Sequence, residues 1–495
     1  MRKLIFSILL GGLCQFSFGQ SDLDALRYSS SDIGSTARSM GAGGAFGALG
    51  ADLSSMQINP AGLALFRTNS FTISGQMANA KSKTEYQGNT KRDYDFGLNV
   101  PSVGLVFHNG KYENRRPAKK GWLNTNFAMA INQTNNFNGI VNYNGSNDQN
   151  SMLNYFAERA NGLSINELSA SSEELSYGYN DLETMAWEAY LIDSVGLRTY
   201  HPAIDDLDRA LSQKNVISTS GSTNDISLSL SSNYENKFYL GGGISLTTVR
   251  YKEENRFTEV DESTNLDNWA AWTLEQNLLT KGIGVSGNLG IIVRPNEKLR
   301  VGAAIKTPTI YSLKDEYYDE LNVDFDDGTF GNYQSSEGFY EYKVLSPMRT
   351  TLSGAYIFGK SGFISTDVEI MDYSMMRLRP AISAFEIAND RIGEKYGRAV
   401  NLRIGGEYVL NVVRLRAGFA RYSSPLTNAR DNNLTRTFLT TGIGIQDKRW
   451  ALDMAVVQRM GKEQIQPYTL DSGTVPVATN TATRNSLVLT LTTKF

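Results

Sequence analysis

The residues of this chain that could take part in chemistry are few, and their spacing fits none of the common catalytic or phosphate-binding motifs. Gly41 and Gly43 begin a G-x-G pattern, but Phe46 stands where a dinucleotide-binding loop needs its third glycine. No Gly-Lys-Ser/Thr follows, which excludes a P-loop. The two histidines, His108 and His201, leave little for a histidine-based active site. We therefore expect no enzymatic activity, no catalytic residues and no cofactor.

Cys14, the only cysteine, lies in a predicted secretory signal at residues 1–19. This segment has positive residues at 2–3, an apolar core over 4–13 that is too short to span a bilayer, and small residues before a cleavage site at Gln20. The mature chain then has no cysteine. This excludes disulfides, thiol catalysis and cysteine-based metal sites, and we expect no metal.

Apolar and polar residues alternate along much of the chain from residue 222 onward, which predicts β-strands. In the last segment, one face carries Leu487, Leu489, Leu491, Thr493 and Phe495. A final strand that ends in an aromatic residue resembles the assembly signal of bacterial outer-membrane barrels. We therefore expect the barrel-assembly machinery to recognise Phe495.

Short and long connections alternate between the predicted strands. Tight connections near 234–237 and 446–449 contrast with long polar stretches such as 254–282 and 313–340. Short periplasmic turns and long extracellular loops are typical of outer-membrane barrels. The pattern predicts an all-β fold, an antiparallel transmembrane β-barrel of about 14 strands over residues 67–495, in the bacterial outer membrane.

Composition is compatible with this class. The net charge of −3 leaves no electrostatic footprint for nucleic acid. Hydrophobic residues make up 41% of the chain, but no long apolar run follows the signal, which excludes a helical membrane protein. A membrane barrel stays possible, because its strands hide their apolar residues in alternation.

A barrel of this width needs a plug, because its own strand side chains do not fill the lumen. Residues 20–66 precede the first strand and are rich in small residues, so we predict that they fold into the lumen as a hatch. An Asn-Pro turn can anchor such a segment, since asparagine bonds its own turn and proline fixes one backbone angle. The other interpretation of the turn is purely structural. The candidate hatch and gating residues are Gly41, Gly43, Gly44, Asn59, Pro60 and Ala61.

Two of the long loops contain helical spacing. Apolar residues recur at that spacing in the long extracellular insertion at 136–221, and the stretch 265–281 suggests a short helix that Asn268 caps and that carries Trp272. Such apolar faces need a partner. Either they pack on each other, or they form an apolar entry groove for a ligand.

With these features, the chain resembles the FadL/TodX family of outer-membrane transporters for hydrophobic compounds, over essentially the whole mature chain. The segment from Arg38 to Leu63 looks like the family's N-terminal hatch, with Asp52 and Asn59–Leu63 as its most recognisable part. The further matches are strand phrases before an extracellular Ser/Thr-Pro: Pro295–Ala303 with Thr307-Pro308, and Leu415–Phe419 with Ser424-Pro425.

The resemblance implies a 14-stranded barrel plugged by a hatch that gates passive uptake of long-chain fatty acids or other hydrophobic small molecules. It also implies that the ligand leaves sideways through a gap in the wall, among the outer-membrane lipids. That route avoids water, in which each exposed CH₂ costs about 0.8 kcal/mol.

The candidate ligand-binding residues are Phe46, Arg300, Arg414 and Arg416. Arginines on the lumen side could hold a carboxylate head group. The alternative is that they pair with lumen acids such as Asp367, Glu369 and Asp453.

Three other functions stay open at this point. A barrel of this kind can be a structural or secretion-apparatus component that binds a protein partner. Haem uptake would require axial ligation by His108, His201 or tyrosines. An outer-membrane lipase would need a Ser–His pair on the wall, for which neither histidine has an obvious partner.

Overall fold

The computed structural model describes residues 22–114, 116–169, 181–204, 211–262, 269–380, 382–428, 434–471 and 473–495. The predicted signal at residues 1–19, its cleavage site and Asn268 lie outside these ranges. None of the helices within them has the length and hydropathy of a membrane span.

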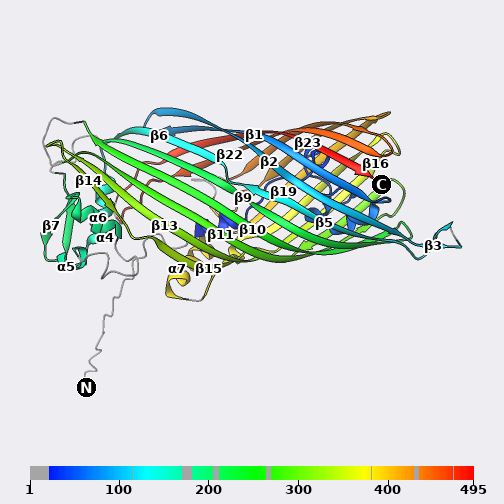
Figure 1. Cartoon of the computed structure of the whole chain (residues 1–495), viewed down its shortest axis with the longest axis horizontal. Coiled ribbons are helices and arrows are strands. Elements are labelled where there is room, and N and C mark those ends of the chain that lie inside the picture. Colours follow the sequence, from blue (N-terminus) through cyan, green and yellow to red (C-terminus); the bar gives the residue numbers. More distant parts are fainter. Residues whose placement is uncertain are drawn as a thin grey trace, which may run out of the picture.

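Fourteen antiparallel strands form a closed barrel, in which the last strand pairs with the first (Figure 1). This confirms the predicted fold class and strand number. The strands are β1 (Ser70–Tyr86), β2 (Asn89–Gly110), β5 (Trp122–Asn136), β9 (Leu211–Tyr234), β10 (Phe238–Asp261), β11 (Trp269–Val293), β12 (Leu299–Lys306), β16 (Arg349–Ile357), β17 (Gly362–Asp372), β19 (Arg398–Leu410), β20 (Val413–Tyr422), β21 (Arg436–Gln446), β22 (Trp450–Ile465) and β23 (Ala478–Lys494).

Three of these strands are interrupted and continue as separate segments. The strand β12 continues as β13 (Ile310–Phe325), β16 is preceded by β15 (Gly338–Leu345), and β5 is followed by β6 (Gly139–Asn147). A proline lies in two of the interruptions, at Pro308 and Pro347, where it removes a backbone donor from the ladder. The remaining short strands are β3 (Tyr112–Glu113), β4 (Arg116–Pro117), β7 (Ile192–Gly196), β8 (Thr199–Pro202), β14 (Phe330–Gln334) and β18 (Arg377–Arg379).

The strands are much longer than a membrane requires. The strand β11 has 25 residues, which corresponds to about 80 Å, whereas an apolar band in such barrels is about 25 Å tall. Much of the predicted loops at 254–282 and 313–340 is therefore strand, and those predictions were wrong. Alternation between apolar and polar residues fades there because the outer face of the wall no longer meets lipid.

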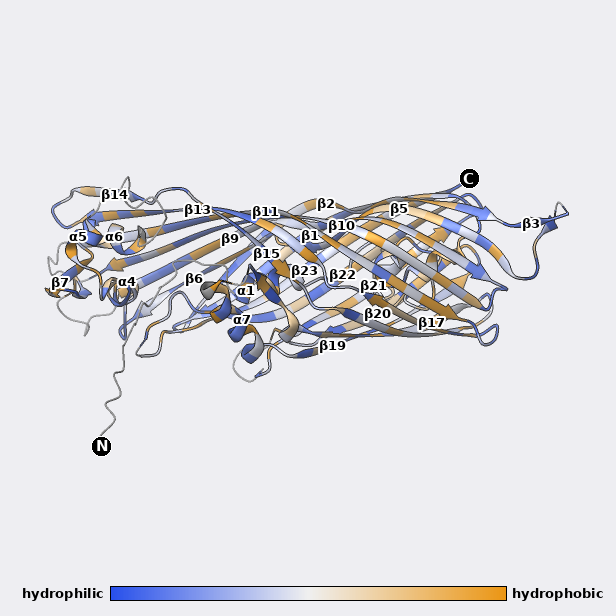
Figure 2. Ribbon diagram, turned by 90° about the horizontal axis from the view of Figure 1, so that it is seen from below, coloured by the Kyte–Doolittle hydropathy of each residue, from blue (hydrophilic) through white to orange (hydrophobic). Residues whose placement is uncertain are grey.

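Side chains alternate between the lumen and the outer surface. On β9, for example, Ser227, Ser229 and Ser231 are buried, while Ile226 and Leu228 are exposed. Apolar residues recur on the outer surface along the half of the barrel that holds the C-terminus (Figure 2). That exposed band has the composition of a lipid-facing surface.

The segment before β1 lies inside the barrel. It forms α1 (Asp22–Ser29), α2 (Ala37–Gly41), α3 (Ser55–Ile58) and the 3₁₀ helix η1 (Pro60–Leu65). The helix η1 contacts β9, β10 and β11, whereas α2 contacts β20, β21 and β22 on another side of the lumen. All ten residues from Gly41 to Gly50 are buried. The segment thus bridges the lumen as a plug does.

Helices also lie beyond the apolar band. They are α4 (Met152–Ala160), α5 (Ile165–Leu168), α6 (Asp181–Glu188), the 3₁₀ helix η2 (Tyr373–Met375) and α7 (Ser383–Lys395). The first three confirm a partly helical insertion. The predicted helix at 265–281 was wrong, because residues 269–281 belong to β11. A register shift between Trp269 and Ala271 places Trp269 and Trp272 in one buried cluster, so a bulged strand produced the spacing of a helix.

Candidate functional site in the barrel lumen

The glycine-rich part of the hatch is docked on the wall at distances that leave no room for side chains. Gly43 has φ +65°, and a Cβ built on it would lie 2.7 Å from the carbonyl oxygen of Ile404. Opposite it, a Cβ on Gly418 of β20 would lie 2.2 Å from the Gly43 nitrogen. The Gly43 N–H donates to Thr440 Oγ1 at 3.0 Å, and that hydroxyl donates to the Gly41 carbonyl at 3.0 Å. Gly44, also at positive φ, packs against Ile33.

The Asn-Pro turn is docked on a second group of wall glycines. Asn59 Nδ2 donates to the carbonyls of Gly47 at 2.7 Å and Ile291 at 3.2 Å, and its Oδ1 accepts from the Ala61 N–H at 3.1 Å. A Cβ on Gly290 of β11 would lie 1.9 Å from Asn59 Oδ1. A Cβ on Gly241 of β10 would lie 2.4 Å from the Pro60 carbonyl carbon. The turn therefore holds the hatch to the wall, as an anchor would.

The predicted ligand-binding arginines do not converge. Arg416 is buried and pairs with Asp453 and Glu407, at 2.7 Å each. In this structure it therefore pairs with lumen acids, which was the alternative to binding a ligand carboxylate. Arg414 lies 3.8 Å from the same Glu407. Arg300 is apart from this cluster and donates to the Leu49 carbonyl of the hatch at 2.6 Å.

Phe46 also serves the hatch–wall contact in this state. Its ring stands perpendicular to that of Phe363 on β17, with centroids 5.9 Å apart, and the Arg38 guanidinium lies 5.3 Å from its centroid. Phe46 therefore lies at the contact between the hatch and the wall, as Arg300 does.

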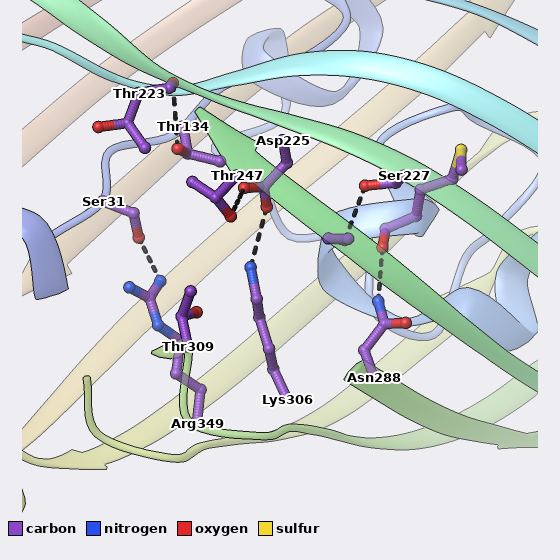
Figure 3. Close-up of polar contacts among 12 residues, drawn as sticks. Ser31, Thr134, Thr223, Asp225, Ser227, Thr247, Asn288, Lys306, Thr309 and Arg349 are labelled. Atoms are coloured by element: carbon purple, nitrogen blue, oxygen red, sulfur yellow. Dashed lines mark hydrogen bonds and ion pairs between the residues drawn. The ribbon is translucent and has the colours of Figure 1, made fainter. Parts of the chain in front are cut away.

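A small polar chamber lies between the hatch and the wall. Its volume is about 70 Å³, enough for a few water molecules, and its lining includes the charged side chains of Asp225, Lys306, Arg349, Glu369 and Arg403. Figure 3 shows Asp225 accepting from Thr247 at 2.6 Å and pairing with Lys306 at 2.9 Å. With this volume and charged lining, the chamber suits water rather than an apolar ligand.

The arginines of this chamber connect its two sides. Arg349 donates to the Ser29 carbonyl at 2.7 Å and to the Ser31 hydroxyl, so it holds the end of α1 (Figure 3). Arg403 lies 3.7 Å from Glu369 and 3.8 Å from Asp367, the two lumen acids expected as partners of the predicted arginines.

The hydrogen-bonded ladder of the wall is interrupted beside β2, and this gap in strand pairing is here called the opening. Residues Ser102–Gly110 of β2 pair with β5, but residues 89–99 pair only with β1. The next segment, β6, pairs with β9, and the described residues include no pairing between β6 and β2. Along this unpaired edge, β2 exposes Tyr94, Phe96, Leu98 and Val100. Leu98 pairs with Met77 of β1, whose side chain belongs to the exposed apolar band.

The interruption between β5 and β6 turns toward the hatch. The Phe137 ring packs edge-on against Tyr28 of α1, with centroids 6.4 Å apart, and against Tyr251 of β10 at 5.2 Å. Arg484 of β23 donates to the carbonyls of Asn136 at 2.9 Å and Asn138 at 2.5 Å. The opening is thus flanked by a segment that touches both the plug and the wall.

Comparisons with known proteins agree with this architecture. No family model matches the chain, and no curated protein matches it. Among solved structures, it is similar to a FadL homologue of Pseudomonas aeruginosa, with 13% identity and a TM-score of 0.56 over 94% of this chain and 99% of the other. The toluene transporters TodX of P. putida (12%, TM-score 0.51) and TbuX of Ralstonia pickettii (14%, TM-score 0.50) match over the same shares.

This chain has the fold of the FadL and TodX channels. The resemblance seen in the hatch segment is confirmed at the level of the fold, at sequence identities too low to show more.

The extracellular end of this FadL-type barrel is covered by a cap built from the insertion. Phe156 of α4, Met185 of α6, and Trp269 and Trp272 of β11 share one buried cluster. In this structure, the apolar faces of the loops therefore pack on each other rather than forming an entry groove. Its attachment centres on Glu259 of β10, which accepts from the Ser151 hydroxyl at 2.5 Å, the Met152 N–H at 3.0 Å and Gln213 Nε2 at 2.6 Å.

Among the charged residues of the chamber, sequence reasoning named Glu369 as a lumen acid and missed Asp225, Lys306, Arg349 and Arg403. Lys306 directly precedes Thr307-Pro308, and Arg349 follows shortly after Pro347, so both lie at the ends of strands interrupted at a proline. A charged residue on the lumen face beside such an interruption was the feature of the sequence that could have indicated the chamber. Asp225, which pairs with Lys306, lies 81 residues earlier, and nothing local connects the two.

Proposed function

We propose that this chain is a bacterial outer-membrane channel for hydrophobic small molecules, which leave it sideways between β2 and β6. The exposed apolar band on the outside of the closed barrel supports the membrane location. Phe495 stays our proposed recognition point for the barrel-assembly machinery, and its side chain is exposed.

The observation that carries this proposal is the unpaired edge of β2 beside a blocked lumen. In this proposal the docked hatch closes the axial route, and the polar chamber between the hatch and the wall is water-sized. In this proposal, an apolar molecule avoids both water and the hatch by leaving through the opening at residues 89–99. Because Leu98 and Val100 line its outer side, the exit leads into the acyl region of the bilayer.

The hatch is well placed to control this exit. Tyr28 of α1 touches Phe137 in the interruption, and Arg349 holds the end of the same helix. We propose that displacement of α1 by an arriving ligand releases Phe137 and widens the opening. In this proposal, Gly41, Gly43, Gly44 and the Asn59–Ala61 turn anchor the hatch while α1 moves.

For the ligand, we propose long-chain fatty acids or other hydrophobic compounds, moved passively without enzymatic chemistry. Two of the similar structures are toluene transporters by name, and another is a FadL homologue. They support a hydrophobic ligand for this fold. The choice between an aromatic hydrocarbon and a fatty acid is left to the experiment.

The test is a reversible disulfide across the opening. A Cβ on Gly97 would lie 3.3 Å from Asn138 Nδ2, so cysteines introduced by Gly97→Cys and Asn138→Cys can meet. We expect uptake of labelled oleate or toluene to be lost when the pair is oxidised and restored when it is reduced.

A matched control places a disulfide between two strands that are already hydrogen-bonded to each other. Gln458 Nε2 donates to Asn485 Oδ1 at 3.1 Å across β22 and β23, so Gln458→Cys with Asn485→Cys should leave uptake unchanged in both redox states. Undiminished uptake through the oxidised Gly97–Asn138 pair would rule out the sideways route. No uptake of either compound by the unmodified chain would favour a secretion-associated or haem-related role.

A further inference from the structure

The end of the barrel that holds the C-terminus is strongly basic. Its turns and chain ends, here called the basic rim, are residues 66–69, 110–114, 116–122, 234–238, 293–299, 357–362, 410–413, 446–450 and 493–495. They contain 12 Lys and Arg against 4 Asp and Glu, a net charge of +8 in a chain whose total is −3. Net positive charge is therefore concentrated at one end of the molecule.

Among the residues that the structure describes, most of the rim cations have no acidic partner. Lys111 lies 3.9 Å from Glu113, and Lys237 lies 3.9 Å from Glu235. Within the described ranges, no carboxylate lies within ion-pair distance of the other rim cations. The exposed ones among them are Arg67, Arg116, Lys119, Lys120, Lys298, Lys360, Lys448 and Arg449. Unpaired and exposed, they are available to an anionic partner.

Aromatic residues in the same turns place these cations at the surface of the membrane. Trp122 follows Lys120 closely and stacks edge-on against Tyr234, with centroids 5.3 Å apart. Trp450 follows Arg449, and Phe358 precedes Lys360. Exposed tryptophan, tyrosine and phenylalanine at barrel ends mark the boundary between acyl chains and headgroups. Long basic side chains beside them reach the headgroup layer.

We propose that the basic rim binds the anionic headgroups of phospholipids in the leaflet that surrounds this end of the barrel. The charges come from turns around the circumference rather than from one face, which suits a ring of lipids better than a single docked protein. Their density is highest in the connection from β2 to β5, where Lys111, Arg116, Lys119 and Lys120 lie in or beside the hairpin of β3 and β4 that projects beyond the barrel end (Figure 1). Clusters of this size attract anionic lipid, and salt screens the attraction.

The inference relies on the proposed function only for the membrane location, and its test needs no transport. The chain has five tryptophans, of which Trp122 and Trp450 lie at the rim, while Trp187, Trp269 and Trp272 lie in the cap. Brominated acyl chains quench only tryptophans that reach the bilayer. Quenching by brominated phosphatidylglycerol and brominated phosphatidylcholine in reconstituted vesicles therefore reports lipid preference at the rim.

We expect the unmodified chain to prefer phosphatidylglycerol by about threefold or more at low salt, and less at high salt. A rim variant with Arg116→Gln, Lys119→Gln, Lys120→Gln, Lys448→Gln and Arg449→Gln should bring the ratio close to one. These side chains are exposed, and circular dichroism would verify that the variant folds.

The control removes as many cations from the opposite end: Lys91→Gln, Arg92→Gln, Lys252→Gln, Arg256→Gln and Lys281→Gln. All five lie on exposed strand positions outside the rim, so the preference should stay as in the unmodified chain. Equal quenching by both lipids in the unmodified chain would overturn the inference, even if uptake is normal. An equal loss of preference in the control would also overturn it, because it would reflect total charge rather than the rim.

Discussion

At the scale of single residues, the plug and the wall are fitted to each other through glycine. The contacts of Gly43 with Gly418, and of Asn59 with Gly290, bring backbone or amide atoms to places that any side chain would fill. Such contacts are short and numerous, and they allow backbone hydrogen bonds across the interface. The glycine-rich stretch of the hatch is therefore close-packed rather than loose in this state.

The first prediction tests this fit with Gly418→Ala. The added Cβ would lie 2.2 Å from the backbone nitrogen of Gly43. Because this is a backbone atom, the clash can be relieved only if the hatch shifts. Overpacking of this kind should destabilise the docked hatch by about 1–3 kcal/mol, measured by hydrogen exchange at residues 41–50. Gly354→Ala is the matched control, because a Cβ there meets nothing within 4 Å. Similar exchange in the two variants would contradict the fit.

The second prediction concerns the anchor at Asn59, which is buried and donates to two carbonyls. Asn59→Ala should cost about 1–3 kcal/mol, because the buried Gly47 carbonyl loses its donor. Asn59→Asp should cost at least as much, since it keeps the acceptor for Ala61 but places negative charge beside the two carbonyls. The readout is hydrogen exchange at residues 55–65. A harmless aspartate would show that only the turn-forming acceptor matters.

At the scale of elements, the cap depends on one buried carboxyl, that of Glu259. It belongs to the part of β10 that lies outside the membrane, and it binds the start of α4. Burial raises the pKa of Glu259 to about 7, although hydrogen bonds from Ser151, Met152 and Gln213 oppose the rise. An exposed glutamate has a pKa of about 4.3. The docked cap therefore holds a proton more tightly than an undocked one would.

The third prediction follows from this difference. Protonated Glu259 favours docking fully below the ordinary pKa, and this contribution is lost as pH rises toward about 7. Opening of α4, measured by hydrogen exchange corrected for intrinsic rates, should increase by up to about tenfold per pH unit between pH 5 and 7. In Glu259→Gln the opening should be independent of pH. The same slope in both proteins would assign it to another group.

At the scale of the whole molecule, the barrel and its plug are separate in sequence. The wall closes through the pairing of β1 with β23, and neither strand belongs to the hatch. A barrel of this width without internal filling would conduct ions. The hatch should therefore be dispensable for the barrel but necessary for its seal.

The fourth prediction is that deletion of residues 22–66 leaves a folded barrel that conducts ions in planar bilayers, whereas the intact chain conducts little. Loss of the barrel's circular dichroism signal in the deletion would mean that the hatch is part of the folding unit. A folded but non-conducting deletion would mean that another segment seals the lumen.

The sequence alone determined the class of this protein, because class depends on local patterns. Each strand residue meets either lipid or lumen, so the period-two alternation of Ile226 to Ser231 already indicates a two-sided wall. Short turns, the plug segment before β1 and the terminal Phe495 are likewise readable in order along the chain. The strand number and the position of the hatch segment followed from them.

Only the tertiary structure decided which residues meet. Lys306 pairs with Asp225, and Gly43 contacts Gly418, because closure of the barrel brings distant strands around one plug. The extent of β11 beyond the membrane was hidden, since the outer face there no longer requires apolar residues. The opening beside β2 was hidden for a similar reason. A missing strand pairing is a property of two segments and their register, and neither segment records it alone.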